Sequence, residues 1–250
     1  WEEIKTSAAA AQAAGAEWGV LLDQVNRYYQ LQPLPESAGG GSGIGPGQLD
    51  LDITNAGWVK AMEYYHSIFE EGLSPRGIPP QQTQDMFANG QVAYFVGGVW
   101  WQGKFDGTEG LNWAMAPHPY FEGGEVVTPT GAWSWGVSPS SDHVEEATEF
   151  IRYAALTTEG ALAAMEGYPL PPANLVAYET FAGNQIVAEA TDLIAFELAN
   201  TARIRPPTIG WVEFEELTGT AFEDIRNGSD PTERLQQAQE EIERAWSRLG

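Results

Sequence analysis

Tryptophans beside glycine are the residues of this sequence best suited to binding chemistry. The chain has ten Trp in 250 residues, and three groups of them border glycine, at 97–101, 131–135 and 209–211. In a glycine-flanked turn an indole can present its apolar face to a ligand while its N–H donates a hydrogen bond. Sugars offer apolar C–H faces and hydroxyl groups that suit such a surface, so these groups predict a carbohydrate-binding site. Packing in the core is the alternative for each group taken singly.

Acidic residues beside one of these tryptophans raise a second hypothesis, a carbohydrate-active enzyme fragment such as a glycosidase or lyase. Trp211 is followed by Glu213, Glu215 and Glu216. Glycoside hydrolysis needs two carboxyl groups on either side of one bond, and acids so close together on one helix cannot flank it. Negative side chains at the start of a helix are also favoured by the helix dipole. The sequence therefore predicts a protein that is not an enzyme and has no catalytic residues.

Two other patterns do not predict a cofactor or a metal site. Residues 98–104 match the GxxxxGK spacing of a phosphate-binding loop, but Phe105 stands where that loop needs Ser or Thr. The three histidines, His66, His118 and His143, lack the spacing of metal ligands. We therefore expect neither a cofactor nor a metal.

The charge balance restricts the partners of the chain. It carries 12 Lys+Arg against 35 Asp+Glu, a formal net charge of -23, and no cluster of basic residues. Such a surface repels nucleic acids and anionic lipids, so we expect no nucleic-acid partner. An interaction or scaffold protein that uses this acidic surface is a third hypothesis. No segment reaches the roughly 20 apolar residues of a membrane span.

Hydrophobic periodicity and turn residues predict a helix-rich α/β protein with short strands. Helices are expected at 54–72 with Thr54 as N-cap, from Asp142 onward, at 158–165, at 184–200, at 214–225, and at 231–249 with Asp230 as N-cap. Strands are expected at 18–22, 91–96, 112–116 and 133–138. The helix after Asp142 should bury an apolar face made of Val144, Ala147, Phe150, Ile151 and Ala154. The glycine-rich residues 39–47 should form a mobile surface turn.

Five segments in order resemble the extracellular solute-binding proteins of ABC importers, in the carbohydrate-binding group that includes maltose-binding protein. They are WEEI at 1–4, MFANGQVAY at 86–94 followed by the GGVWW turn at 97–101, residues 131–138 followed by EEATEFIRYAALTTEG at 145–160, PPA at 171–173, and the closing helices at 211–228 and 231–249. In place of the usual lysine, Gln91 stands in the second segment. Each motif is weak alone, but their order extends over nearly the whole chain.

The resemblance implies a two-lobe fold of the periplasmic-binding-protein type, with a cleft for solute between the lobes. The match begins partway through that plan, so residues 1–250 are expected to be the C-terminal part of a longer protein whose first lobe segment is absent. They would form one lobe and part of the other. Residues 131–180 are expected to belong to the first lobe and could leave an apolar face exposed here.

The resemblance also implies ligand-binding residues. Trp100 matches the stacking tryptophan of the family's ligand loop, with Trp101 beside it, and Trp211 lies near a late stacking aromatic. Tyr28 or Tyr29 lies in the region of an early aromatic of the cleft. The remaining candidates are two tryptophans of a strand that reaches the cleft and two arginines that could bind hydroxyls or a carboxylate, namely Trp133, Trp135, Arg203 and Arg205.

The function implied by the resemblance is non-catalytic binding of a carbohydrate solute and its delivery to an ABC-transporter permease. The expected partners are that small-molecule carbohydrate, the permease and the missing N-terminal lobe. The expected location is extracellular or periplasmic, with the full-length protein tethered to the membrane as a lipoprotein.

Overall fold

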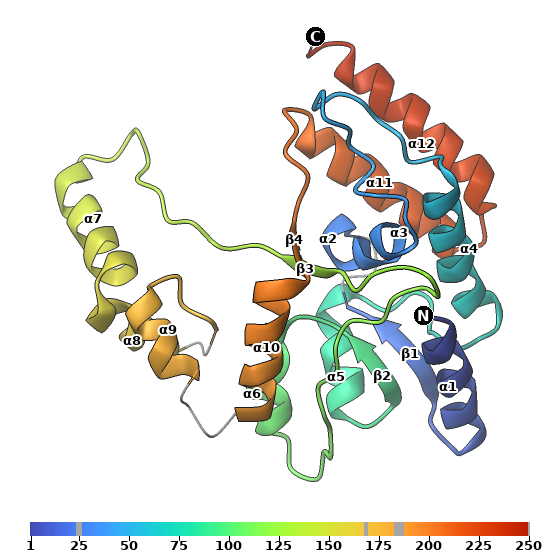
Figure 1. Cartoon of the computed structure of the whole chain (residues 1–250), viewed down its shortest axis with the longest axis horizontal. Helices are drawn as coiled ribbons and strands as arrows, with labels where there is room; N and C mark the ends of the chain where they lie inside the picture. The colour runs from blue at the N-terminus through green and yellow to red at the C-terminus, as the bar shows by residue number, and fades with distance from the viewer. Residues whose placement is uncertain (24–26, 168–169, 183–187, 250) are drawn as a thin grey trace.

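The computed structural model describes residues 1–23, 27–167, 170–182 and 188–249. The chain forms a compact body, residues 1–127 and 205–249, and an arm, residues 131–182, which projects from it (Figure 1). The body and the arm are connected where the chain leaves the body near residue 128 and returns to it near residue 204.

Helices dominate both parts. The body contains α1 (Glu2–Ala13), β1 (Trp18–Leu22), α2 (Tyr28–Leu31), α3 (Pro33–Ser37), α4 (Ala56–Glu70), η1 (Pro80–Gln82), α5 (Thr83–Ala88), β2 (Val92–Val96), η2 (Val99–Trp101), α6 (Gln102–Asp106), α11 (Trp211–Arg226) and α12 (Pro231–Trp246). The connection and the arm contain β3 (Thr128–Thr130), α7 (Val144–Ile151), the π-helical turn η3 (Arg152–Leu156), α8 (Thr158–Gly167), α9 (Leu175–Ala182), α10 (Ala188–Asn200) and β4 (Ala202–Ile204). The helix-rich α/β class predicted from the sequence is confirmed.

The described residues form two sheets, and each consists of two parallel strands. In the body, β1 pairs with β2 from Trp18↔Val92 to Leu22↔Val96, as expected for apolar runs that are separated by helices. Where the chain passes between body and arm, β3 pairs with β4 from Thr128↔Ala202 to Thr130↔Ile204. The predicted strands at 112–116 and 133–138 are wrong, because these residues have no ladder of hydrogen bonds to a neighbouring strand.

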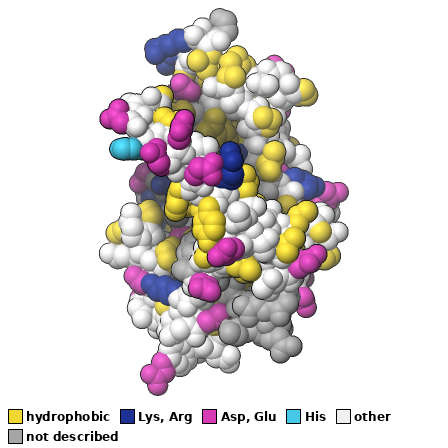
Figure 2. All heavy atoms as spheres, turned by 90° about the vertical axis from the view of Figure 1, so that its left-hand side faces the viewer, with side chains coloured by type: hydrophobic (Ala, Val, Ile, Leu, Met, Phe, Trp, Pro, Cys, Tyr) yellow, Lys and Arg dark blue, Asp and Glu magenta, His cyan; other side chains and the backbone are white. Residues whose placement is uncertain are grey.

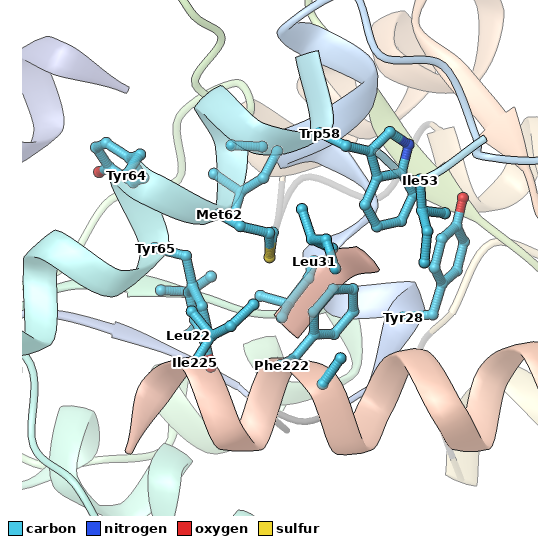
Figure 3. Packing of buried hydrophobic residues seen from close by; sticks show 14 of the residues in the cluster. Leu22, Tyr28, Leu31, Ile53, Trp58, Met62, Tyr64, Tyr65, Phe222 and Ile225 are labelled. Carbon is cyan, nitrogen blue, oxygen red and sulfur yellow. The ribbon is translucent and has the colours of Figure 1, made fainter. Parts of the chain in front are cut away.

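The main core lies in the body, where α4 packs on α11 and α12. Figure 3 shows Trp58 and Met62 of α4 directed toward Phe222 of α11, with Tyr28 of α2 at one side. As predicted, α12 buries a periodic apolar face made of Leu235, Ala238, Ile242 and Trp246. Among the described residues, every member of this core cluster comes from the body.

Helix starts follow capping chemistry, with one correction. Asp230 caps α12 by accepting a hydrogen bond from the Glu233 amide at 2.9 Å, as predicted. The predicted cap of α4, Thr54, is wrong: its neighbour Asn55 accepts from the amides of Gly57 at 3.0 Å and Trp58 at 3.2 Å. Asn55 also donates to the Gly40 carbonyl, so the cap joins α4 to the glycine-rich loop.

The glycine-rich loop is packed against the core. A Cβ added at Gly43 would lie 2.6 Å from the Ile53 side chain and 2.9 Å from that of Trp58. The Tyr28 hydroxyl donates to the Ser42 carbonyl at 2.9 Å. The loop therefore follows the surface of Trp58, and an open surface pocket of about 220 Å³ lies between residues 40–45, residues 50–52 and Asn55.

The arm differs from the body in how its apolar residues are placed. The helix predicted after Asp142 forms as α7, but its predicted buried face is wrong, since no residue of α7 is buried. α7 and α8 pack on η3, α8 packs on α9, and α9 contacts α10. Large apolar side chains remain exposed along it: Trp133, Trp135, Val144, Phe150, Tyr153, Leu156, Leu175 and Val176. The part of the 184–200 helix prediction at 184–187 lies outside the described residues, and the rest forms α10.

Candidate ligand-binding site

An aromatic stack lies in the body beside the connection to the arm. The Tyr29 ring of α2 stacks on the Trp100 ring of η2, with centroids 6.3 Å apart and planes 29° apart. Arg205, directly after β4, places its guanidinium carbon 4.6 Å from the centroid of the Tyr29 ring. Three segments far apart in the sequence therefore meet at Tyr29.

The Tyr29 side chain is bonded to the connection as well. Its hydroxyl donates to the Pro129 carbonyl of β3 at 3.1 Å, and Gln32 donates to the Ile204 carbonyl of β4 at 3.2 Å. Burial raises the pKa of the Tyr29 hydroxyl, although the nearby Arg205 charge acts to lower it. The tyrosine is therefore a neutral hydrogen-bond donor that links the stack to both connecting strands.

A buried carboxylate fixes the loop that carries Trp100. Asp23 follows β1 and accepts hydrogen bonds from the Trp101 indole N–H at 2.7 Å and the Thr83 hydroxyl at 2.6 Å. The Asp23 amide donates to the Val96 carbonyl at the end of β2. Charge-assisted hydrogen bonds of this kind are strong. Trp101 thus holds the loop in place, while the half-exposed Trp100 ring is left for contacts on the surface.

Tyr28, the neighbour of Tyr29, lies in the core. It is 0% exposed, and its ring contacts those of Trp58, Phe214 and Trp211. Burial raises the pKa of its hydroxyl well above the usual value. Of the two tyrosines considered from the sequence, Tyr29 belongs to the stack with Trp100, and Tyr28 belongs to the core.

Trp211 begins α11 and is half-buried against the core. Its ring meets that of Tyr28 edge-on, with centroids 5.6 Å apart. Because Tyr28 and Tyr29 are consecutive residues of α2, the helix places Trp211 and Trp100 near the same short segment. The described contacts do not bring these two indoles together.

The other predicted site residues are divided between the connection and the arm. Arg203 is exposed and donates to the Ala202 carbonyl, and its charge acts on Glu36, whose pKa is nevertheless raised by burial. Trp133 and Trp135 lie in the arm, where Trp135 packs on Phe150 with centroids 5.1 Å apart. Among the described ring contacts, neither tryptophan reaches the Tyr29–Trp100 stack.

A model of the bacterial extracellular solute-binding protein family matches residues 1–192 of the chain. The chain belongs to this family. The assignment predicted from the order of the sequence motifs is thereby confirmed, and with it the description of the chain as an extracellular solute-binding protein.

Two sugar-binding proteins of Bacillus subtilis are similar in sequence to this solute-binding protein. The maltodextrin-binding protein MdxE of Bacillus subtilis (strain 168) is 30% identical over 133 residues, which are 51% of this chain and 31% of that protein. The galactooligosaccharide-binding protein of the same organism is 25% identical over 200 residues, 76% of this chain and 46% of that protein. The matched segment thus covers less than half the length of either relative.

Sequence analysis did not predict two residues of the site in this solute-binding protein, Asp23 and Thr83. Asp23 follows the buried run WGVLL of β1, and a polar residue at the carboxyl end of a parallel strand is a signal that could have identified it. Thr83, its partner, opens α5 and offers no comparable signal. In the former phosphate-loop candidate, Lys104 pairs with Asp85 of α5.

The described residues contain no group of three or more His, Cys, Asp or Glu side chains that could hold a metal ion. Within the same residues, no helix is long and apolar enough to cross a bilayer.

Proposed function

We propose that this chain binds a carbohydrate solute without chemical conversion, and that the complete protein delivers the solute to an ABC-transporter permease. The observation that carries the proposal is the Tyr29–Trp100 stack in a chain of the solute-binding family. The printed names of the two relatives, for maltodextrin and galactooligosaccharide, support a sugar as the solute.

The stack suits the chemistry of a pyranose ring. The C–H face of a sugar would lie against the Trp100 indole, which removes apolar surface from water. The Asp23–Trp101 hydrogen bond fixes the loop before the sugar arrives, and this preorganisation lowers the entropic cost of binding. Polar groups at the edge of the stack would then select among hydroxyl arrangements.

Calorimetric titration of the complete protein against mono-, di- and oligosaccharides tests this function. We expect at least one sugar to bind with micromolar or tighter affinity, about -8 kcal/mol, and no release of reducing ends from any oligosaccharide. The 250-residue chain alone should bind the same sugar weakly or undetectably, because it would offer only part of the cleft. Absence of binding to every sugar, or turnover of one, would contradict the proposal.

We further propose that the arm packs against a segment outside residues 1–250, the first lobe of the same protein. Figure 2 views the molecule from the side of the arm and shows hydrophobic side chains spread between acidic ones. Trp133 is 92% exposed and Leu175 81% exposed, which is unusual for large apolar side chains in a soluble protein. The greater length of the relatives leaves room for such a segment. Closure of the two lobes on the solute would then be the state that the permease recognises, and a lipid anchor would hold the complete protein at the membrane.

Hydrogen exchange measures whether the arm is covered. We expect peptides from 144–167 to exchange at least about tenfold more slowly in the complete protein than in the 250-residue chain, because covering apolar surface stabilises the arm helices. Peptides from α12, which already packs on α4 and α11, provide the control and should exchange alike in both. Equal exchange of the arm in the two proteins would show that nothing covers it.

A further inference from the structure

Arg205 is one of five basic residues for which the described residues show no carboxylate pair, and of these it is the one that lies on the aromatic stack. The protein has about three acidic residues for every basic one. Most basic side chains therefore pair with a carboxylate, namely those of Lys5, Lys60, Arg76, Lys104, Arg152, Arg226 and Arg234. Arg205 has no such pair among the described residues. It lies instead on the Tyr29 ring, the inner member of the aromatic stack.

The guanidinium of Arg205 is held in position although it is exposed. The guanidinium lies over the Tyr29 ring, and its carbon is 4.6 Å from the ring centroid. Gly131 lies close by, since a Cβ added there would be 3.3 Å from Nη1 and 3.7 Å from Cζ of Arg205. A guanidinium that stacks through its face keeps its in-plane N–H donors available to a planar acceptor. A carboxylate matches this donor arrangement with two parallel hydrogen bonds.

The carboxylates near the stack are already engaged. Asp23 is buried and bonded to Trp101 and Thr83. Glu36 accepts a hydrogen bond from Gln32 at 2.8 Å, and the Arg203 charge acts to lower its pKa. Within the part of the chain that the structure describes, no carboxylate therefore pairs with the Arg205 guanidinium beside the candidate sugar platform.

A solute that covers the stack would remove water from Arg205. Taking an unpaired charge out of water is costly unless the ligand supplies the opposite charge. Neutral hydroxyls would leave that cost partly uncompensated, whereas a carboxylate would offset it. On the basis of the proposed function, we propose that the solute is an acidic saccharide, a uronate-containing oligosaccharide, whose carboxylate binds Arg205 while its ring stacks at Tyr29 and Trp100.

Pairs of sugars that differ only in a carboxylate measure its contribution to binding. The complete protein is titrated with α-1,4-galactobiose and α-1,4-digalacturonate, and with maltose and its C6-oxidised diuronate, because the members of each pair differ only at C6. We expect a uronate to bind at least about tenfold more tightly than its neutral partner. The preference should shrink as NaCl is raised from about 50 to 500 mM, since salt screens the pair.

Variants assign the preference to Arg205. Arg205→Gln should abolish the difference between uronate and neutral sugar, while Arg205→Lys should retain part of it. Arg244→Gln is the matched control, because Arg244 is also exposed and without a carboxylate pair among the described residues but lies on α12. Unchanged circular dichroism and melting temperature would confirm that each variant is folded.

The outcomes separate this inference from the function on which it rests. Equal or tighter binding of the neutral sugars, or a uronate preference that survives in Arg205→Gln, overturns the acidic solute and leaves sugar binding in place. Binding of no sugar at all overturns both proposals.

Discussion

Trp58→Ala is expected to lower the free energy of unfolding of the chain by about 3–5 kcal/mol, the usual cost of emptying a large buried aromatic site. The Trp58 side chain is 0% exposed and lies between the rings of Tyr28, at 6.3 Å, and Phe222, at 6.2 Å (Figure 3). Its indole N–H has no hydrogen-bond partner in the described structure, so the loss is one of packing. The glycine-rich loop packed on its edge would lose its support too.

Urea denaturation followed by circular dichroism measures this effect, with Trp133→Ala as the matched control. The same substitution at a side chain that is 92% exposed should change the free energy of unfolding of the chain by less than about 0.5 kcal/mol. Comparable losses in the two variants would contradict the placement of the core in the body and of Trp133 outside it.

Trp100→Ala is expected to weaken solute binding by the complete protein about thirtyfold. One sugar face covers roughly 80 Å² of indole, which at about 25 cal/mol/Å² contributes about 2 kcal/mol. Trp100→Phe keeps a smaller ring and should lose only part of this affinity. Stability should change little in either variant, because the Trp100 side chain is only partly buried and lies outside the main core.

Titration calorimetry with the tightest-binding sugar provides the measurement. Tyr120→Ala, which removes an exposed aromatic ring of the body, is the control and should bind as the unmodified protein does. Binding by Trp100→Ala within about twofold of the unmodified protein would remove the stack from the proposed site.

Local sequence features account for those parts of the body that were predicted correctly. Asp230 with Glu233 marks the start of α12, and its apolar residues recur at helical spacing up to Trp246. The apolar runs of β1 and β2 form a parallel pair, in which β1 is buried from Gly19 to Leu22 and β2 is buried only at Val92. In each case one segment carries its whole signal, which is why no tertiary information was needed.

Neighbouring residues with similar chemistry were harder to separate. Tyr28 and Tyr29 differ by about 100° around a helix, so one can enter the core only if the other turns away from it. The choice depends on Trp58 and Phe214, which lie elsewhere in the chain. The same reason explains the roles of Trp100 and Trp101, since the buried Asp23 accepts a hydrogen bond from the Trp101 indole while Trp100 stacks on Tyr29.

By itself, the sequence determined the helix-rich α/β class, the main helices and strands of the body, and the family of solute-binding proteins. The tertiary structure decided which aromatic residues meet at Tyr29, which carboxylate fixes their loop, and that the apolar face of α7 is not buried within the described chain. Hydrophobic periodicity indicates which side chains of one segment share an apolar face, because it reflects the geometry of that segment alone. Which partner it finds depends on contacts between residues far apart in sequence, and only the folded chain contains those.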